Sequence, residues 1–236
     1  MARKRSLFDR ALVAMMPLVP KSVVKRIAKR YVAGETLEEA ITRCRELNAQ
    51  GAMVTIDVLG EEIENIEAGA ATRDAYFAVL DALQRERIDG NASVKLTAFG
   101  LKIDPEICFE RLRAVVEHAR DLDNFVRIDM EDSEVTTATL DQYRRLRTEG
   151  FNNTGVVLQA YMRRSQKDVA DLAHHRPSYR LCKGIYVEPE KVAFQDGAAI
   201  NRNYLTLLED MLARGSYVGI ATHDHRLVDA AFEMVA

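Results

Sequence analysis

The chain has 236 residues and a formal net charge of −3, with 47% hydrophobic and 29% charged residues. This composition is that of an ordinary soluble globular protein, and no apolar run approaches the roughly 18 residues that a membrane-spanning helix needs. Three widely spaced cysteines, an odd number, fit neither a disulfide scaffold nor a zinc module. We therefore expect a protein of a reducing, cytoplasmic compartment.

Basic residues are concentrated near the amino terminus. Residues 1–30 hold nine lysines and arginines and one acid, Asp9, with apolar residues at helical spacing among them. We interpret residues 1–35 as a basic helical arm packed on the rest of the chain. Peripheral contact with an anionic membrane and a cleaved transit peptide are the alternatives. Nucleic acid is not an expected partner, because the remainder of the chain is acidic and repels phosphate.

From residue 36 onward, short β-branched runs alternate with helical patterns. A capping box at Thr36 opens the first helix, Asp104 followed by proline opens another, and we expect Ser165 and Asp168 to cap a short one. Six strands are expected, over residues 53–59, 92–98, 125–130, 155–160, 179–184 and 217–222. Helices separate these strands, and a last helix is expected over residues 226–236.

This alternation predicts parallel βαβ units, which fit both an open doubly wound sheet and a closed barrel. The glycine loops that bind phosphate in open sheets are absent from the sequence, and polar residues follow nearly every expected strand. A barrel collects its active site from all of its strand ends. We therefore favour an α/β fold of the (βα)8 TIM-barrel type, with about six of eight units in residues 36–236.

The polar residues at the strand ends predict a site at one mouth of this barrel. They are Asp57, Glu61, Lys95, Asp129, Glu131, Gln159, Lys183, Thr222 and His223. Spacing alone leaves a Schiff-base aldolase open, because a desolvated lysine in a barrel, such as Lys95 or Lys183, is a suitable nucleophile. The pair His223 and His225 is a weak metal pattern, since the other histidines fall on expected helices or loops, and we expect no metal site.

One motif from each expected strand, taken in order, resembles the strand motifs of the proline dehydrogenases. The six motifs are VTIDVLGE (54–61), SVKLTA (93–98), RIDMED (127–132), VLQAY (157–161), RLCKGIY (180–186) and ATHD (221–224). A single motif is a weak signal, whereas six in the right order are a strong one. The resemblance covers nearly everything after residue 35.

This resemblance implies a (βα)8 barrel that binds FAD at its mouth and oxidises L-proline to Δ1-pyrroline-5-carboxylate, the first step of proline degradation to glutamate. It also implies that electrons pass to a quinone in the membrane. Position by position, it assigns catalysis to Asp129 and Arg180, and substrate binding to Lys95 and Tyr186. The implied flavin contacts are Met130, Gln159, Arg180, Lys183, Gly184, Ile185, Thr222 and His223.

Elementary chemistry agrees with these implied roles. Flavin accepts a hydride from proline, so the protein orients the reactants and tunes the cofactor. A fixed, planar cation such as Arg180 stabilises electron-rich reduced flavin, and Lys95 suits the carboxylate of a small zwitterion. The proline amine must be neutral for hydride to leave, so we expect activity to rise with pH until the amine is deprotonated.

Two departures from the family pattern bear on these expectations. Ile185 stands where the family most often has alanine, and its added bulk narrows the pocket if the side chain points inward. The family also closes with two further strands and a helix bearing an arginine pair that clamps the proline carboxylate, and Arg202, Arg214 and Arg226 cannot replace that pair.

The expected strands begin about every 33 residues, so two missing units need roughly 65 more residues. We therefore expect a C-terminally incomplete barrel that keeps most flavin contacts and does not catalyse the reaction alone. The non-enzymatic alternative is a truncated barrel whose unpaired strand edge serves only in oligomerisation or binding.

Overall fold

The computed structural model describes residues 33–60 and 63–235. The arm expected over residues 1–35, apart from its last three residues, and Glu61 lie outside the described residues. Within the described ranges, no helix is both long and apolar enough to cross a membrane. The described residues divide into two compact units, one with residues 33–54 and 82–90, the other with residues 55–60, 63–81 and 91–235.

The smaller unit contains helix α3 (Leu37–Asn48), which begins as the capping box predicts. The Thr36 hydroxyl accepts a hydrogen bond from the Glu39 amide at 3.3 Å, and the Glu39 carboxylate accepts one from the Glu35 amide at 2.8 Å. At the other end of the helix, the Asn48 side chain exchanges hydrogen bonds with the backbone of Asp89, at 2.8 and 3.1 Å. These contacts confirm the first predicted helix.

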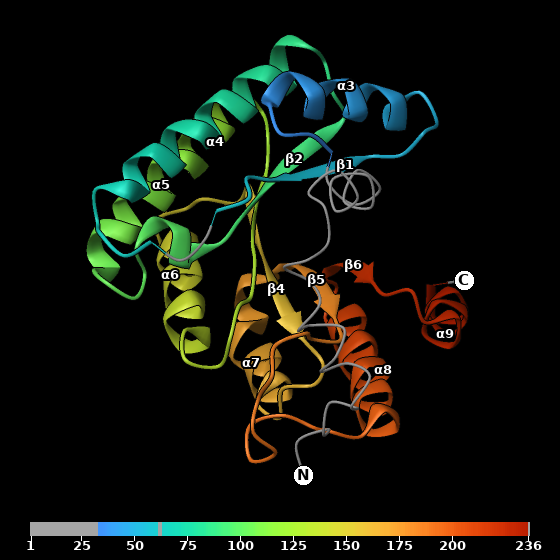
Figure 1. Cartoon of the computed structure of the whole chain (residues 1–236). Helices are drawn as coiled ribbons and strands as arrows, with labels where there is room; N and C mark the ends of the chain where they lie inside the picture. Colours follow the sequence, from blue (N-terminus) through green and yellow to red (C-terminus); the bar gives the residue numbers. More distant parts are fainter. Residues whose placement is uncertain (1–32, 61–62, 236) are drawn as a thin grey trace, which may run out of the picture. The chain divides into compact units, whose positions relative to one another are not determined.

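A six-stranded sheet runs through the molecule in the order β1-β2-β3-β4-β5-β6 (Figure 1). Its strands are β1 (Val54–Asp57), β2 (Gly90–Val94), β3 (Val126–Ile128), β4 (Thr154–Gln159), β5 (Ser178–Cys182) and β6 (Tyr217–Ala221). From β2 onward, each strand pairs in parallel with the next along the chain. A doubly wound sheet reverses its strand order at a switch point, so this sequential order supports the predicted barrel type.

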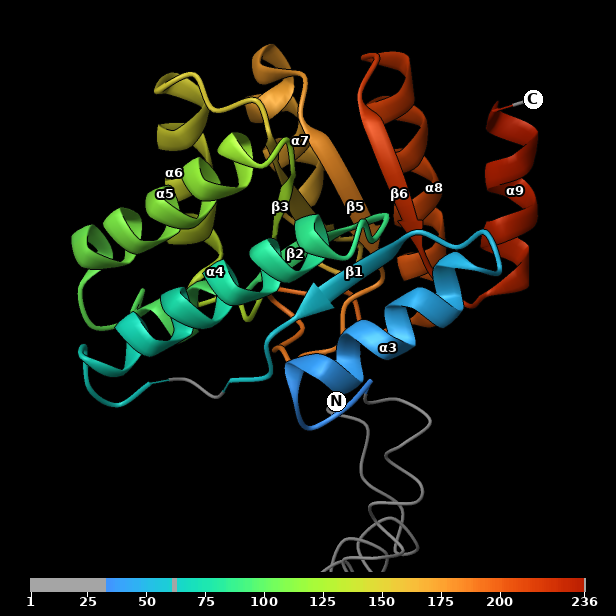
Figure 2. The same ribbon diagram turned by 90° about the horizontal axis from the view of Figure 1, so that it is seen from above.

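Helices connect the strands, as Figure 2 shows from above. They are α4 (Ala68–Arg85), α5 (Pro105–Asp121), α6 (Thr136–Thr148), α7 (Ser165–Leu172), α8 (Gly197–Ala213) and α9 (His225–Val235), with short 3-10 turns η2 (Leu96–Phe99) and η3 (Ala173–His175). In the larger unit, α5 contacts β3, α6 contacts β4, and α8 contacts β5 and β6. All six predicted strands and the helices between them are therefore present, with shifted ends.

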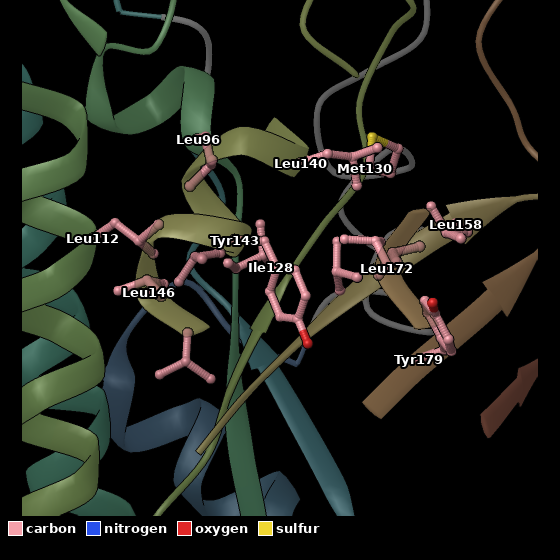
Figure 3. Close-up of a cluster of buried hydrophobic side chains, with 14 of the residues drawn as sticks. Leu96, Leu112, Ile128, Met130, Leu140, Tyr143, Leu146, Leu158, Leu172 and Tyr179 are labelled. Atoms are coloured by element: carbon pink, nitrogen blue, oxygen red, sulfur yellow. The ribbon is translucent and has the colours of Figure 1, made fainter. Parts of the chain in front are cut away.

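Side chains of the strands alternate between an apolar and a polar face of the sheet. Val94, Ile128, Val156 and Tyr179 are almost fully buried and belong to the main hydrophobic core with the helices. Figure 3 shows this core, in which Ile128 and Tyr179 lie among side chains of α5, α6 and α7. Because strand residues alternate in direction, the residues between them, including Arg127, point to the opposite face.

Two predicted details are wrong. The second strand ends at Val94 rather than at residue 98, because Lys95 is followed by the buried turn η2, which Gly100 closes with a φ of 101°.

The second wrong detail is the cap of a helix. The short helix α7 has Arg164 as its N-cap, without a capping side chain. Ser165 instead donates to the Gln159 carbonyl at 2.6 Å. Asp168 pairs with the Arg164 guanidinium at 2.8 Å. The Asp104 cap of α5 is confirmed, since its carboxylate accepts from two backbone amides.

Candidate active site at the strand ends

Two acids and two bases from four strands form a connected cluster on the polar face of the sheet. Lys95, directly after β2, pairs with Asp57, the last residue of β1. The Lys95 ammonium also lies 3.7 Å from the carboxylate of Asp129, directly after β3. Asp129 in turn pairs with Arg180 of β5. Charges therefore alternate along the chain of contacts Asp57–Lys95–Asp129–Arg180, which we call the ion cluster.

Tyr76 and Ser93 form hydrogen bonds with members of the ion cluster. The Tyr76 hydroxyl lies 2.7 Å from the Ser93 carbonyl oxygen and 3.1 Å from the Asp57 carboxylate, and it can donate its hydrogen bond to either acceptor. The Ser93 hydroxyl accepts a hydrogen bond from the Arg180 guanidinium at 3.0 Å. Burial, and next the Asp57 charge, raise the pKa of Tyr76 well above its usual value. The phenol therefore stays neutral and serves as a donor.

Arg180 carries its charge in a partly desolvated place. Its side chain is 26% exposed and that of Asp129 15%, and burial lowers the pKa of Arg180. A guanidinium nevertheless stays protonated at neutral pH. A fixed, planar cation thus stands at the strand ends, beside a carboxylate that neutralises it.

A second set of contacts joins the ends of β2, β3 and β4. The buried Glu131 carboxylate accepts hydrogen bonds from the Thr97 amide at 3.1 Å and from the Thr97 hydroxyl. The Gln159 side-chain amide donates to the carbonyls of Met130 and Glu131, at 3.0 and 2.8 Å. These two donations orient the amide, so that its buried Oε1 atom is left without a partner in the described part of the chain. A buried acceptor of this kind is suited to a ligand N–H.

The segment after β5 is a tight turn with exposed side chains. Gly184 has a φ of 107°, and a Cβ atom there would meet the Tyr161 ring, so only glycine fits without strain. Ile185 is 87% exposed, so its side chain points to the surface and is not packed in the core of the described residues. Tyr186 is 36% exposed, and burial followed by the Glu131 charge raises its pKa. This turn offers apolar surface next to the strand ends.

The remaining predicted cofactor residues gather at the ends of β5 and β6. The Lys183 ammonium pairs with Asp224 at 2.7 Å, and the Asp224 amide donates to the Thr222 hydroxyl at 3.1 Å. Hydrogen bonds from Arg226 and Lys183 lower the pKa of Asp224. His223 is exposed. In the described residues, no hydrogen bond or ion pair joins this group to the ion cluster.

The structure thus brings together Lys95 and Asp129, which the strand-end rule predicts at one mouth, and Arg180, which only the family resemblance assigned to the site. Sequence reasoning left Tyr76 and Ser93 out of the site, and gave Asp57 only as a strand-end residue. Ser93 lies two residues before Lys95 on the same strand, so the period of two was a signal for it. No group of three metal-ligating side chains occurs within the described ranges.

Comparisons with known proteins identify the family of this chain. The family model described as "Proline dehydrogenase" matches residues 40–236. The chain is 34% identical to Proline dehydrogenase 1 of Bacillus subtilis subsp. natto over 89% of this chain and 69% of that protein. It is 35% identical to Proline dehydrogenase of Deinococcus radiodurans over 86% of this chain and 67% of that protein.

A solved structure shares the fold. The crystal structure of proline utilization A (PutA) from Bdellovibrio bacteriovorus superposes with a TM-score of 0.83 at 23% identity, over 91% of this chain and 27% of that chain. The chain therefore spans about two thirds of the two similar proline dehydrogenases and about a quarter of PutA. The family match over most of the residues leads to one conclusion. The chain belongs to the proline dehydrogenase family.

Proposed function

We propose that the ion cluster and the surrounding strand ends form the proline and flavin site of an FAD-dependent proline dehydrogenase. The reaction is the oxidation of L-proline to Δ1-pyrroline-5-carboxylate, with electrons passed to a quinone. Family membership supports the reaction class. The observation that carries the assignment of the site is the meeting of Lys95, Asp129 and Arg180, three residues from separate strands, in one group of contacts.

The residues at the strand ends fit a flavin in their chemistry. The unpartnered, buried Gln159 oxygen is an acceptor that the imide N–H of an isoalloxazine ring can satisfy. The Gly184 turn lets backbone approach without a side chain in the way. Residues Met130, Gln159, Arg180, Lys183, Gly184, Ile185, Thr222 and His223 would hold the cofactor.

Bound FAD would supply the hydride acceptor. The protein's own contribution is to orient the substrate and the cofactor and to balance their charges. Lys95 holds the substrate carboxylate, and Tyr186 borders the substrate. Arg180 provides positive charge where electrons accumulate, which lowers the energy of the transition state. Asp129 lies between these two cations and fixes their positions, so that substrate and cofactor are held together in one orientation.

Peripheral contact with a membrane through the basic residues 1–30 belongs to the same proposal, because a membrane quinone must be reached. Binding to anionic vesicles tests this part separately. Sedimentation with vesicles that weakens as salt is raised supports it, since a polybasic segment is attracted by surface charge. Equal sedimentation with neutral vesicles would contradict it.

The test of the proposed function is an FAD titration of the purified chain. We expect saturable binding of one FAD, seen as a change in flavin absorption and fluorescence. Binding of L-proline under anaerobic conditions is then expected to shift the flavin absorption bands without bleaching them, in keeping with a chain that binds but does not catalyse alone, whereas D-proline leaves the bands unchanged. A control is the surface variant Lys167→Met, which removes an exposed lysine that pairs with Asp171 on α7. A colourless protein that resists loading with FAD would overturn the proposal.

The Schiff-base aldolase is separated from this function by trapping. Lys95 is engaged by Asp57 and Asp129, and Lys183 by Asp224. Each amine is therefore engaged in an ion pair and is not free to attack a carbonyl carbon. We therefore expect no adduct when the protein is treated with borohydride and a carbonyl compound such as pyruvate. Mass spectrometry that finds Lys95 or Lys183 modified would favour the aldolase.

A further inference from the structure

Arg127 is a buried arginine on the polar face of the sheet to which the proposed function gives no role. The residue is only 7% exposed, and among the described residues its guanidinium has no carboxylate partner. It donates instead to the Ser178 carbonyl oxygen at 2.5 Å and to the Ser178 hydroxyl at 3.0 Å. Its guanidinium also lies over the Phe125 ring, 4.8 Å from the ring centroid. Burying a cation without a carboxylate partner still costs free energy, so its place calls for an explanation.

The two residues belong to strands that are not neighbours. Arg127 lies on β3 and Ser178 on β5, so the side chain spans β4, which lies between them. It crosses at Gly155, the residue of β4 that is in register with both. A Cβ atom at Gly155 would meet the Arg127 guanidinium and the Ser178 carbonyl. The absence of a side chain on β4 is therefore what makes the crossing possible.

This bridge has the same two strands at its ends as the Asp129–Arg180 pair. Asp129 follows Arg127 by two residues, and Arg180 follows Ser178 by two. Because side chains alternate along a strand, a step of two residues returns to the same face of the sheet. Val157, which is in register with Arg180, occupies the corresponding place on β4. Two successive side-chain contacts thus link β3 to β5. The first joins Arg127 to the neutral acceptors of Ser178, and the second, two residues further along each strand, is the ion pair of Asp129 with Arg180.

We propose that Arg127 is a positioning residue, whose bridge across Gly155 to Ser178 sets the spacing of β3 and β5 and thereby aligns Asp129 with Arg180. The proposal rests on the proposed function for the roles of those two residues. Among the described residues, Arg127 makes no hydrogen bond or ion pair with a member of the ion cluster, although its positive charge and that of Arg180 repel each other. A guanidinium suits this task because its planar fork makes two hydrogen bonds in a fixed direction.

The first experiment measures FAD affinity in a double-mutant cycle of Arg127→Met and Arg180→Met. Misplacement by 0.5 to 1 Å weakens a site on the order of tenfold or more. We expect Arg127→Met to raise the FAD dissociation constant about tenfold in the wild-type background and less than about twofold in the Arg180→Met background. Equal factors in both backgrounds would contradict an action through Arg180.

Two further variants distinguish the proposed alignment of Asp129 with Arg180 from a general loss of protein stability and from the positive charge of Arg127. Val156→Ala, on the apolar face next to Gly155, creates a core cavity and lowers stability without touching the bridge. We expect it to leave FAD affinity within about twofold of wild type. Arg127→Lys keeps the positive charge but cannot reach both acceptors of Ser178, so we expect an intermediate affinity. Full affinity in the lysine variant would mean that charge alone matters and would overturn the bridge.

A crystal structure of the ligand-free Arg127→Met variant tests alignment without reference to flavin. We expect the contact between the Asp129 and Arg180 side chains to be broken or displaced in this variant and retained in Val156→Ala. An unchanged pair in Arg127→Met would refute the inference. If the wild-type chain fails to bind FAD, the proposed function fails, and this structural comparison still decides the role of Arg127.

Discussion

Replacing Asp129 with asparagine tests whether the ion cluster is held together by charge. The substitution keeps size and one acceptor oxygen but removes the negative charge facing Lys95 and Arg180. At 3.7 Å and an effective dielectric constant of about 20, the attraction to Lys95 alone is about 4 kcal/mol. Desolvation offsets part of this attraction, and the Lys95 and Arg180 side chains are 32% and 26% exposed, so solvent screens another part. We expect a net loss of about 2 kcal/mol in the free energy of unfolding.

The matched control makes the same chemical change at the surface. Asp210 of α8 pairs at 2.8 Å with Arg214, the C-cap residue of the same helix, but the two side chains are 39% and 40% exposed. Such a pair contributes less than about 0.5 kcal/mol. Urea unfolding of both variants, with unchanged slopes, measures the two losses. Equal losses in Asp129→Asn and Asp210→Asn would refute the claim that partial burial strengthens the cluster.

Three further outcomes follow from the site. Lys95→Met is expected to weaken L-proline binding to the FAD-loaded protein about tenfold or more, because a charged hydrogen bond is lost, while FAD affinity stays the same; a parallel loss of FAD affinity would contradict the assignment. Gln159→Leu is expected to lower FAD affinity about tenfold in a fluorescence titration, and an unchanged affinity would exclude Gln159 from the flavin site. The pKa of Asp224 is lowered in the folded protein. Its stabilisation is therefore fully present above the ordinary value of 3.8 and is lost as the pH falls through the folded-state value. Urea unfolding at several pH values should show a constant deficit in Asp224→Asn near neutrality that shrinks below about pH 4, whereas a deficit independent of pH would rule out this linkage.

The order of strands and helices could be predicted because it depends on local periodicity. β-branched runs, the Thr36 capping box and the Asp104-Pro105 start are short-range signals, and each of them is confirmed. The end of β2 could not be predicted in this way. Residues 96–99 are buried, and all but Thr97 are apolar as in a buried strand, yet they form a 3-10 turn. A contact distant in sequence, the Glu131 carboxylate on the Thr97 amide, satisfies this turn.

The candidate site shows the same division. Lys95 and Asp129 were predicted because parallel strands bring their ends to one edge. Arg180, in the middle of β5, was expected only from the family resemblance. Tyr76 lies on α4 with its ring buried in the core. Its hydroxyl reaches Asp57 and Ser93 only through tertiary packing, which periodicity does not reveal. The bridge from Arg127 to Ser178 likewise depends on the register of three strands.

The most direct test of the central claim is the spectrum of FAD in the purified chain, recorded anaerobically with and without L-proline. The account predicts stoichiometric FAD binding, a spectral change on addition of L-proline but not D-proline, and loss of the proline response in Lys95→Met. Failure of the chain to bind FAD, or an equal response to both enantiomers, would contradict the proposal that the strand ends form a proline and flavin site.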